Sequence, residues 1–162
     1  IEGFANSFGD SGAQAVSVFT AQNTGAGEER RVREGFRNSF LMMLALGAVM
    51  SVLLYAAAPA AIALLAGETS SFTQTNGVAY LRMVGCFYIL CFLGNTFVGY
   101  FRGRGQVTVP VYGTIIQISA RVILSYALIR PMGLSGVALA TGLGWVLVVS
   151  FHSLMYWRTR NR

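Results

Sequence analysis

Long runs of apolar residues alternate with short polar gaps along this sequence. A helix that crosses a bilayer core about 30 Å thick needs roughly 20 apolar residues, because each residue adds about 1.5 Å. Four runs reach that length, and a fifth, at the start, is weaker because it contains Glu2, Asp10 and many small residues. The pattern predicts an all-α, polytopic transmembrane helix bundle. The five predicted spans are 1–25, 40–65, 78–100, 107–129 and 134–157.

The composition indicates that lipid is the solvent around this bundle. Of the 162 residues, 54% are apolar and 11% are charged, and the mean hydropathy is +0.57. Soluble domains usually carry about a quarter charged residues. A chain of this size and polarity could not cover its own core with polar surface. We therefore expect a multi-pass membrane protein.

The basic residues are all arginine, and ten of the twelve occupy the gaps between the spans or the C-terminal tail, in an alternating pattern. Four lie in 26–39, none in 66–77, two in 101–106, one in 130–133 and three in 158–162. Cytoplasmic loops of membrane proteins are enriched in Lys and Arg. The arginine-rich gaps and the C-terminus are therefore predicted to face the cytoplasm. The net charge of +6 is a topology signal and does not indicate nucleic-acid binding.

This topology places Ile1 on the outer side of the membrane. The sequence opens with neither methionine nor a signal peptide, so reaching the outer side requires at least one earlier span. We therefore expect this sequence to be a fragment of a longer protein that lacks its upstream part.

Polar residues recur at every fourth position of the first predicted span, which places them on one face of a helix. Because polar groups inside a membrane usually face a bundle interior or a wet cavity, this stripe predicts a cavity wall. Asp10 is the acid predicted to lie deepest in the membrane. It could bind a proton or a cation, or it could serve as a structural hydrogen-bond partner. The stripe consists of Glu2, Asn6, Asp10, Gln14 and Ser17.

Further polar residues fall inside the later spans. Arg121 is the second deep charge, and we expect it either to pair with an acid on another helix or to extend toward water. Asn95 and Gln117 either line the cavity or form hydrogen bonds between helices. His152, near the inner end of the last span, is expected to be an interfacial or hydrogen-bonded residue.

Signals for an enzyme or a metal site are weak. Cys86 and Cys91 lie in one apolar run without zinc-like spacing. The sequence contains no HExxH motif, no Gly-Lys-Ser/Thr phosphate loop and no arguable Ser/His/Asp or Cys/His set. We expect a protein that is not an enzyme and that uses no cofactor other than a coupling ion.

Three segments resemble the multidrug and toxic compound extrusion (MATE) family of transporters. Residues 15–37 are similar to its signature, a helix that ends in Gln-Asn-x-Gly-Ala-Gly before a basic stretch. Residues 99–113 are similar to its Arg-Gly-x-Gly turn, and residues 133–145 to the opening of its last helix. The matching motif positions are Gln22, Asn23, Gly25, Ala26, Gly27, Arg102, Gly103 and Gly105.

The resemblance implies twelve spans in two six-helix lobes of a plasma (inner) membrane antiporter. The arginine-rich tail favours the second lobe, spans eight to twelve, with the first lobe missing. The family exports organic cations and other amphiphiles in exchange for H⁺ or Na⁺, from a cleft between the lobes that opens alternately to each side. The motif residues are interpreted as structural or gating positions.

This sequence departs from the family pattern at one place. Some members carry an aspartate before the Arg-Gly-x-Gly turn, where Cys91 and Phe92 stand here. Coupling is therefore expected to rest on Asp10 or on an acid of the missing lobe. Two alternatives are a lipid-linked oligosaccharide flippase of related architecture and a membrane scaffold that transports nothing.

Overall fold

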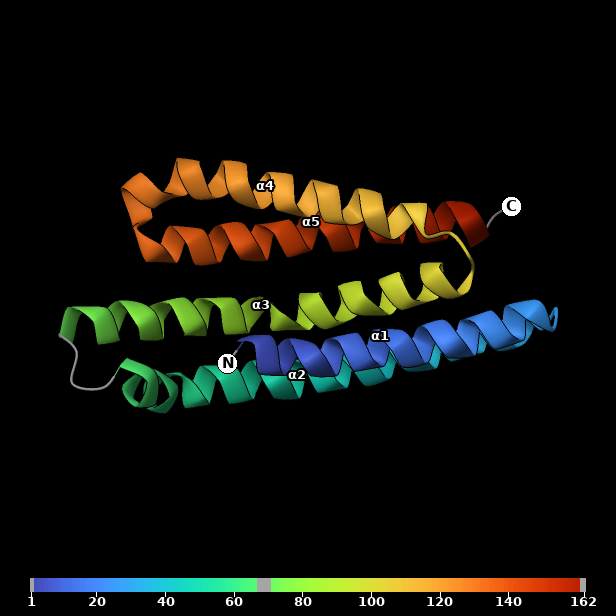
Figure 1. Cartoon of the computed structure of the whole chain (residues 1–162), viewed down its shortest axis with the longest axis horizontal. Coiled ribbons are helices and arrows are strands. Elements are labelled where there is room, and N and C mark those ends of the chain that lie inside the picture. Colours follow the sequence, from blue (N-terminus) through green and yellow to red (C-terminus); the bar gives the residue numbers. More distant parts are fainter. Residues whose placement is uncertain (1, 67–70, 161–162) are drawn as a thin grey trace.

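The protein is a bundle of five long helices in which consecutive helices run antiparallel (Figure 1). The computed structural model describes residues 2–66 and 71–160. The helices are α1 (Glu2–Gly25), α2 (Glu29–Ala66), α3 (Ser71–Gly103), α4 (Thr108–Met132) and α5 (Leu134–Arg160).

The predicted all-α membrane bundle is confirmed, and its helices extend beyond the predicted spans. Four of them, α2 to α5, are long and apolar enough to cross a bilayer. Among the described residues, α1 does not meet that criterion, because its 24 residues are more polar. The arginine-rich gap is also mostly helical, since α2 begins at Glu29 and not near residue 40. Its first turns therefore continue the spanning helix past the apolar run.

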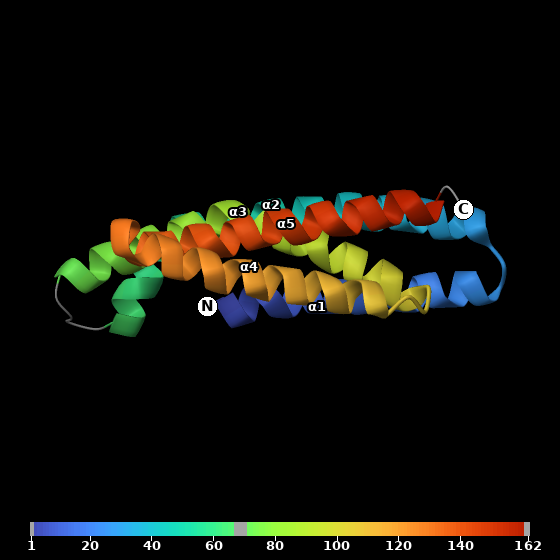
Figure 2. The ribbon, with the colours of Figure 1, turned by 90° about the horizontal axis from the view of Figure 1, so that it is seen from above.

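α3 is the central helix, and it packs against α1, α2 and α5. α4 packs along α5 and barely touches α3. Figures 1 and 2 together show the consequence, with α1 and α4 on one side of α3 and α2 and α5 on the other.

Small residues set the close packing of α1 on α3. A Cβ atom on Gly103 would lie 2.5 Å from the carbonyl oxygen of Ser17 and 2.6 Å from Cβ of Thr20. A Cβ atom on Gly99 would likewise collide with the backbone of Ala13. Glycines four residues apart allow two helix backbones to approach in this way. The spacing therefore fixes how α1 lies along α3.

Two helices end in the same capping geometry. Glu28 N–H donates to the carbonyl of Asn23 (2.9 Å), and Gln106 N–H donates to the carbonyl of Phe101 (2.8 Å). In each case a glycine with positive φ precedes the donor: Gly27 (φ 73°) and Gly105 (φ 72°). These are Schellman motifs, which require a left-handed residue that glycine adopts without a Cβ clash. Both glycines belong to the motifs singled out in the sequence.

The arginine-rich segments gather at one end of the bundle. The α1–α2 turn, the α3–α4 turn and the end of α5 lie together there, because neighbouring helices are antiparallel (Figure 1). An ion pair between Arg104 and Glu29 (2.5 Å) joins the two turns. Arg130 lies near the opposite end, in the last turn of α4. The arginine-rich gaps of the sequence therefore lie at one end of the bundle, and the arginine-poor gaps lie at the other.

Candidate functional site

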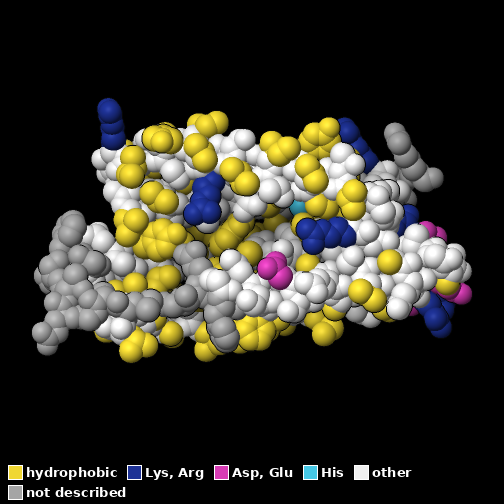
Figure 3. Space-filling view, viewed as in Figure 1, with side chains coloured by type: hydrophobic (Ala, Val, Ile, Leu, Met, Phe, Trp, Pro, Cys, Tyr) yellow, Lys and Arg dark blue, Asp and Glu magenta, His cyan; other side chains and the backbone are white. Residues whose placement is uncertain are grey.

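A cavity of about 200 Å³ lies between α3, α4 and α5. It exists because α4 leans on α5 and leaves its α3 side unfilled. Figure 3 shows the hollow on this face, with histidine atoms at its bottom and basic side chains near it. The polar side chains of its lining come from three helices: Asn95 and Arg102 from α3, Thr114 and Gln117 from α4, and His152 and Trp145 from α5.

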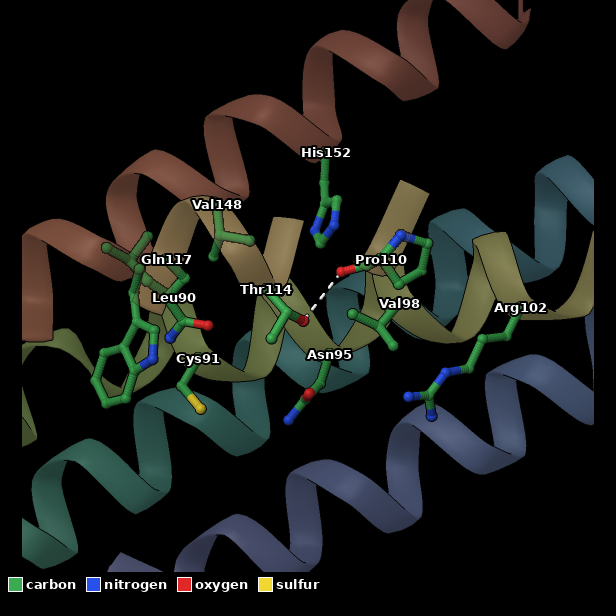
Figure 4. A pocket seen from close by; sticks show the side chains of 12 residues that line it. Leu90, Cys91, Asn95, Val98, Arg102, Pro110, Thr114, Gln117, Val148 and His152 are labelled. Atoms are coloured by element: carbon green, nitrogen blue, oxygen red, sulfur yellow. Dashed lines mark hydrogen bonds between the residues drawn. The ribbon is translucent and has the colours of Figure 1, made fainter. Parts of the chain in front are cut away.

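His152 is the most enclosed polar side chain of the cavity. It is 1% exposed, and neither ring nitrogen has a hydrogen-bond partner among the described residues. The backbone of Val109 faces the ring without reaching hydrogen-bond geometry. Gly113 lies opposite, and a Cβ atom there would come within 2.9 Å of Cε1 of the imidazole. Figure 4 shows the ring directed into the cavity from α5.

The polar side chains around His152 differ in their hydrogen bonding. The hydroxyl of Thr114 donates to the carbonyl of Pro110 (3.0 Å) within α4. Asn95 and Gln117 also border the space (Figure 4). A buried polar group without a partner costs free energy, so water or a bound ion is the expected guest. A cavity of this volume has room for several waters at about 30 Å³ each.

The predicted polar stripe of α1 divides between two environments. Asn6 is part-buried and accepts hydrogen bonds from the hydroxyl of Tyr88 (3.0 Å) and the thiol of Cys91 (3.6 Å). Asp10 and Gln14 are exposed and do not line the cavity. The side chain of Glu2 lies outside the described residues. Only the first part of the stripe therefore approaches the cavity, through Cys91.

Two arginines, Arg121 and Arg102, lie in different surroundings. Arg121 is exposed and lies outside the cavity lining, and it has no ion-pair partner among the described residues. Arg102, identified only as a motif residue, borders the cavity at its arginine-rich end. Asn95 and Gln117, predicted as candidates, both line the cavity.

The sequence did not predict that His152 lies in the cavity. An interfacial or hydrogen-bonded histidine was expected, whereas the structure buries its ring without a hydrogen bond among the described residues. One signal was available, because Trp145, Val148 and His152 follow the i, i+3, i+7 spacing of one helix face. The sequence could not show that Gly113 of another helix leaves room for the ring.

The motif residues lie away from the cavity, except for Arg102. Gln22 and Gly25 are exposed, and the side-chain amide of Asn23 donates to the carbonyl of Phe19 (2.8 Å). They form the end of α1 together with the capping glycine Gly27. No group of three His, Cys, Asp or Glu side chains that could hold a metal ion occurs in the described part of the chain.

Comparison with known proteins gives a consistent result. A family model described as MatE matches residues 1–127. No curated protein sequence matches the chain significantly. Among solved structures, an outward-facing multidrug resistance MATE family transporter of the MOP superfamily is similar over 96% of this chain, with a TM-score of 0.87 and 17% identity. The inward-facing conformation of such a transporter is similar over 92%, with a TM-score of 0.84 and 18% identity.

A third similar structure is a MOP superfamily transporter from Pyrococcus furiosus, whose description reports a binding pocket of reversed polarity and suggests a different function. It is similar over 94% of this chain, with a TM-score of 0.85 and 18% identity. This chain covers 33%, 33% and 35% of the inward-facing, Pyrococcus and outward-facing structures. It therefore corresponds to about a third of their length.

Proposed function

Because this chain belongs to the MATE (MatE) family of transporters, we propose that it is part of a secondary active exporter of amphiphilic or cationic organic molecules. The observation that carries this proposal is the polar cavity between α3, α4 and α5, enclosed within helices long enough to span a bilayer. Polar residues at membrane depth are costly and are typical of ion and substrate pathways.

The arginine pattern also suggests which lobe of the transporter these helices form and which end faces the cytoplasm. We place these helices in the C-terminal lobe, with the arginine-rich end and the C-terminus on the cytoplasmic side of the plasma membrane. The TM-scores to the outward-facing and inward-facing structures, 0.87 and 0.84, are nearly equal. This supports movement of the five helices as one unit while the whole protein alternates between the two sides.

Protons are the coupling ion that this cavity favours. Its lining contains no carboxylate among the described residues, and its titratable side chains are His152 of α5 and Cys91 of α3. Among the described residues of the lining, Arg102 is the one charged side chain, and α4 contributes none. Na⁺ is a hard cation that prefers several oxygen ligands, whereas an imidazole nitrogen is a proton acceptor. His152 is therefore assigned as the proton-binding group of this part of the protein.

The test uses the full-length protein that carries these residues, reconstituted in proteoliposomes with a fluorescent organic cation as substrate. Asn95→Leu with Gln117→Leu should lower the efflux rate about tenfold, because two polar groups of the cavity are lost. Ser119→Ala, on the exposed side of α4, is the control and should leave efflux unchanged. Unchanged efflux in the double variant would remove the cavity from the transport pathway.

A second experiment separates the coupling ions. Efflux is driven either by a pH gradient or by a Na⁺ gradient, in the wild type and in His152→Gln. We expect the pH gradient to drive efflux in the wild type and the variant to lose most of that rate. Efflux driven by Na⁺ alone, or a variant that still responds fully to the pH gradient, would refute proton binding at His152.

A further inference from the structure

A second hollow, of about 530 Å³, lies at the arginine-rich end, between the first turns of α2 and the last turns of α5. We call it the arginine–aromatic groove. Its floor is formed by Phe36, Phe97 and Tyr156, and Arg33, Arg37 and Trp157 stand around it. It shares no lining residue with the polar cavity, which is lined by α3, α4 and α5, whereas the groove is lined by α2, α3 and α5.

The groove exists because α2 and α5 both pack on α3 and do not pack directly on each other. Only side chains bridge the space between them. The rings of Phe36 and Tyr156 stack with centroids 4.5 Å apart, and Phe36 lies 5.4 Å from the ring of Phe97. These rings close the bottom of the groove and make it apolar. Its outer side stays open along both helices.

Two unneutralised charges stand at the edge of this apolar floor. Arg33 and Arg37 are exposed and four residues apart, so they lie on one face of α2. Neither has an ion-pair partner among the described residues, whereas Arg30 pairs with Glu34 (3.7 Å) and Arg104 with Glu29. Like charges at this spacing repel each other. A phosphate between them would relieve that repulsion and would match the planar guanidinium groups.

The groove changes from basic to apolar in the direction of the spanning part of α2. Leu41 lies two turns after Arg33 and is 53% exposed, and Trp157, which also lines the groove, is 67% exposed. Tryptophan is typical of the membrane–water interface, and exposed leucine is typical of a lipid-facing surface. A phospholipid has the same order of chemistry, with an anionic headgroup followed by acyl chains.

We propose that the arginine–aromatic groove binds an anionic phospholipid. Arg33 and Arg37 hold the phosphate, and an acyl chain lies along Leu41, Phe40 and Trp157. Basic pockets between membrane helices are suited to anionic headgroups. The site requires that α2 and α5 span a bilayer and that the rest of the protein leaves the groove open to lipid. It does not depend on the substrate or the coupling ion proposed above.

The test measures lipid retention by native mass spectrometry on the full-length protein purified in a nonionic detergent. Phosphatidylglycerol should be retained in preference to phosphatidylcholine. The double variant Arg33→Gln, Arg37→Gln should lose about thirtyfold in phosphatidylglycerol affinity, because each arginine near a membrane surface favours anionic lipid about fivefold. The matched control, Arg30→Gln with Arg31→Gln, removes the same charge from the same helix outside the groove and should keep most of the affinity.

Two further measurements distinguish binding of a whole phospholipid from binding of its phosphate group alone. Inorganic phosphate at millimolar concentration should not displace the lipid, and Trp157→Ser should weaken lipid retention because the acyl-chain contact is lost. In the unmodified protein, brominated phosphatidylglycerol should quench tryptophan fluorescence more than brominated phosphatidylcholine, and Trp157→Phe should remove that difference. Equal losses in the two double variants, equal retention of the two lipids, or displacement by phosphate would each overturn the proposal.

Discussion

The two hollows of this bundle have opposite chemistry. The cavity between α3, α4 and α5 has polar groups inside, with His152 at its most enclosed point. The arginine–aromatic groove has an apolar floor and its charges at the rim, where Arg33 and Arg37 are exposed. An enclosed polar wall needs water or an ion as its guest, whereas an open apolar floor below a basic rim suits a lipid. Neighbouring gaps between the same helices can therefore serve different ligands.

The different chemistry of the cavity and the groove also predicts which of them contributes more to the stability of the fold. Aromatic rings fill the floor of the groove, and their burial contributes to folding. In the cavity, the two ring nitrogens of His152 have no hydrogen-bond partner among the described residues, and their burial costs free energy. We therefore expect substitutions in the groove floor to act mainly on stability and substitutions in the cavity to act mainly on transport.

The largest effect is expected from Phe36→Ala, which removes the ring at the centre of the groove floor. Phe36 is 7% exposed and contacts the rings of Tyr156 and Tyr100, with centroids 4.5 and 4.9 Å away. The substitution should lower the free energy of unfolding by about 3–5 kcal/mol, measured by thermal or denaturant unfolding in detergent. Leu41→Ala, at an exposed position of the same helix, is the control. A loss no larger than that of the control would show that the rings do not hold α2 and α5 on α3.

The next effect is expected from Gly113→Val, which forces the His152 ring out of its position beside the cavity. A Cβ atom at residue 113 would collide with Nε2 of His152 and would lie 3.1 Å from the Val148 side chain. Efflux should fall about a hundredfold, roughly 2.7 kcal/mol, while retention of phosphatidylglycerol stays unchanged. Ala127→Val, on the exposed side of α4, should leave both unchanged. Loss of lipid retention together with efflux would mean that the cavity and the groove are not separate.

A smaller effect of opposite sign is expected from His152→Leu. This substitution removes two buried nitrogens that lack hydrogen-bond partners among the described residues. The free energy of unfolding should rise by about 1 kcal/mol, while efflux driven by a pH gradient is lost. A clear loss of stability would indicate that the ring makes stabilising contacts and has a structural role.

The smallest effect is expected from Asp10→Asn. Asp10 is exposed and lies outside the cavity lining, so its carboxylate is predicted to take no part in proton binding. Efflux driven by a pH gradient should change less than about twofold, since an exposed group contributes less than about 0.5 kcal/mol. A large loss of efflux would transfer the coupling role from His152 to Asp10.

The sequence by itself determined the order of the helices and two of their ends. The apolar runs predicted four segments and, more weakly, the first, and the arginine pattern predicted which ends lie together. The motif glycines Gly27 and Gly105 marked two helix ends, because the left-handed conformation there is a local requirement. These features depend on residues close together in the chain, so they can be read without knowing what each helix contacts.

Only the tertiary structure decided which faces of the helices meet. Asp10 and Arg121 are exposed, whereas Arg102 borders the cavity and His152 is enclosed in it. In a soluble protein the apolar face of a helix identifies its buried side. In lipid both the buried and the outer sides are apolar, and close approach depends on small residues such as Gly99 and Gly113 on the facing helix. The inward side of a span is therefore set by its neighbours, which a single helix sequence does not contain.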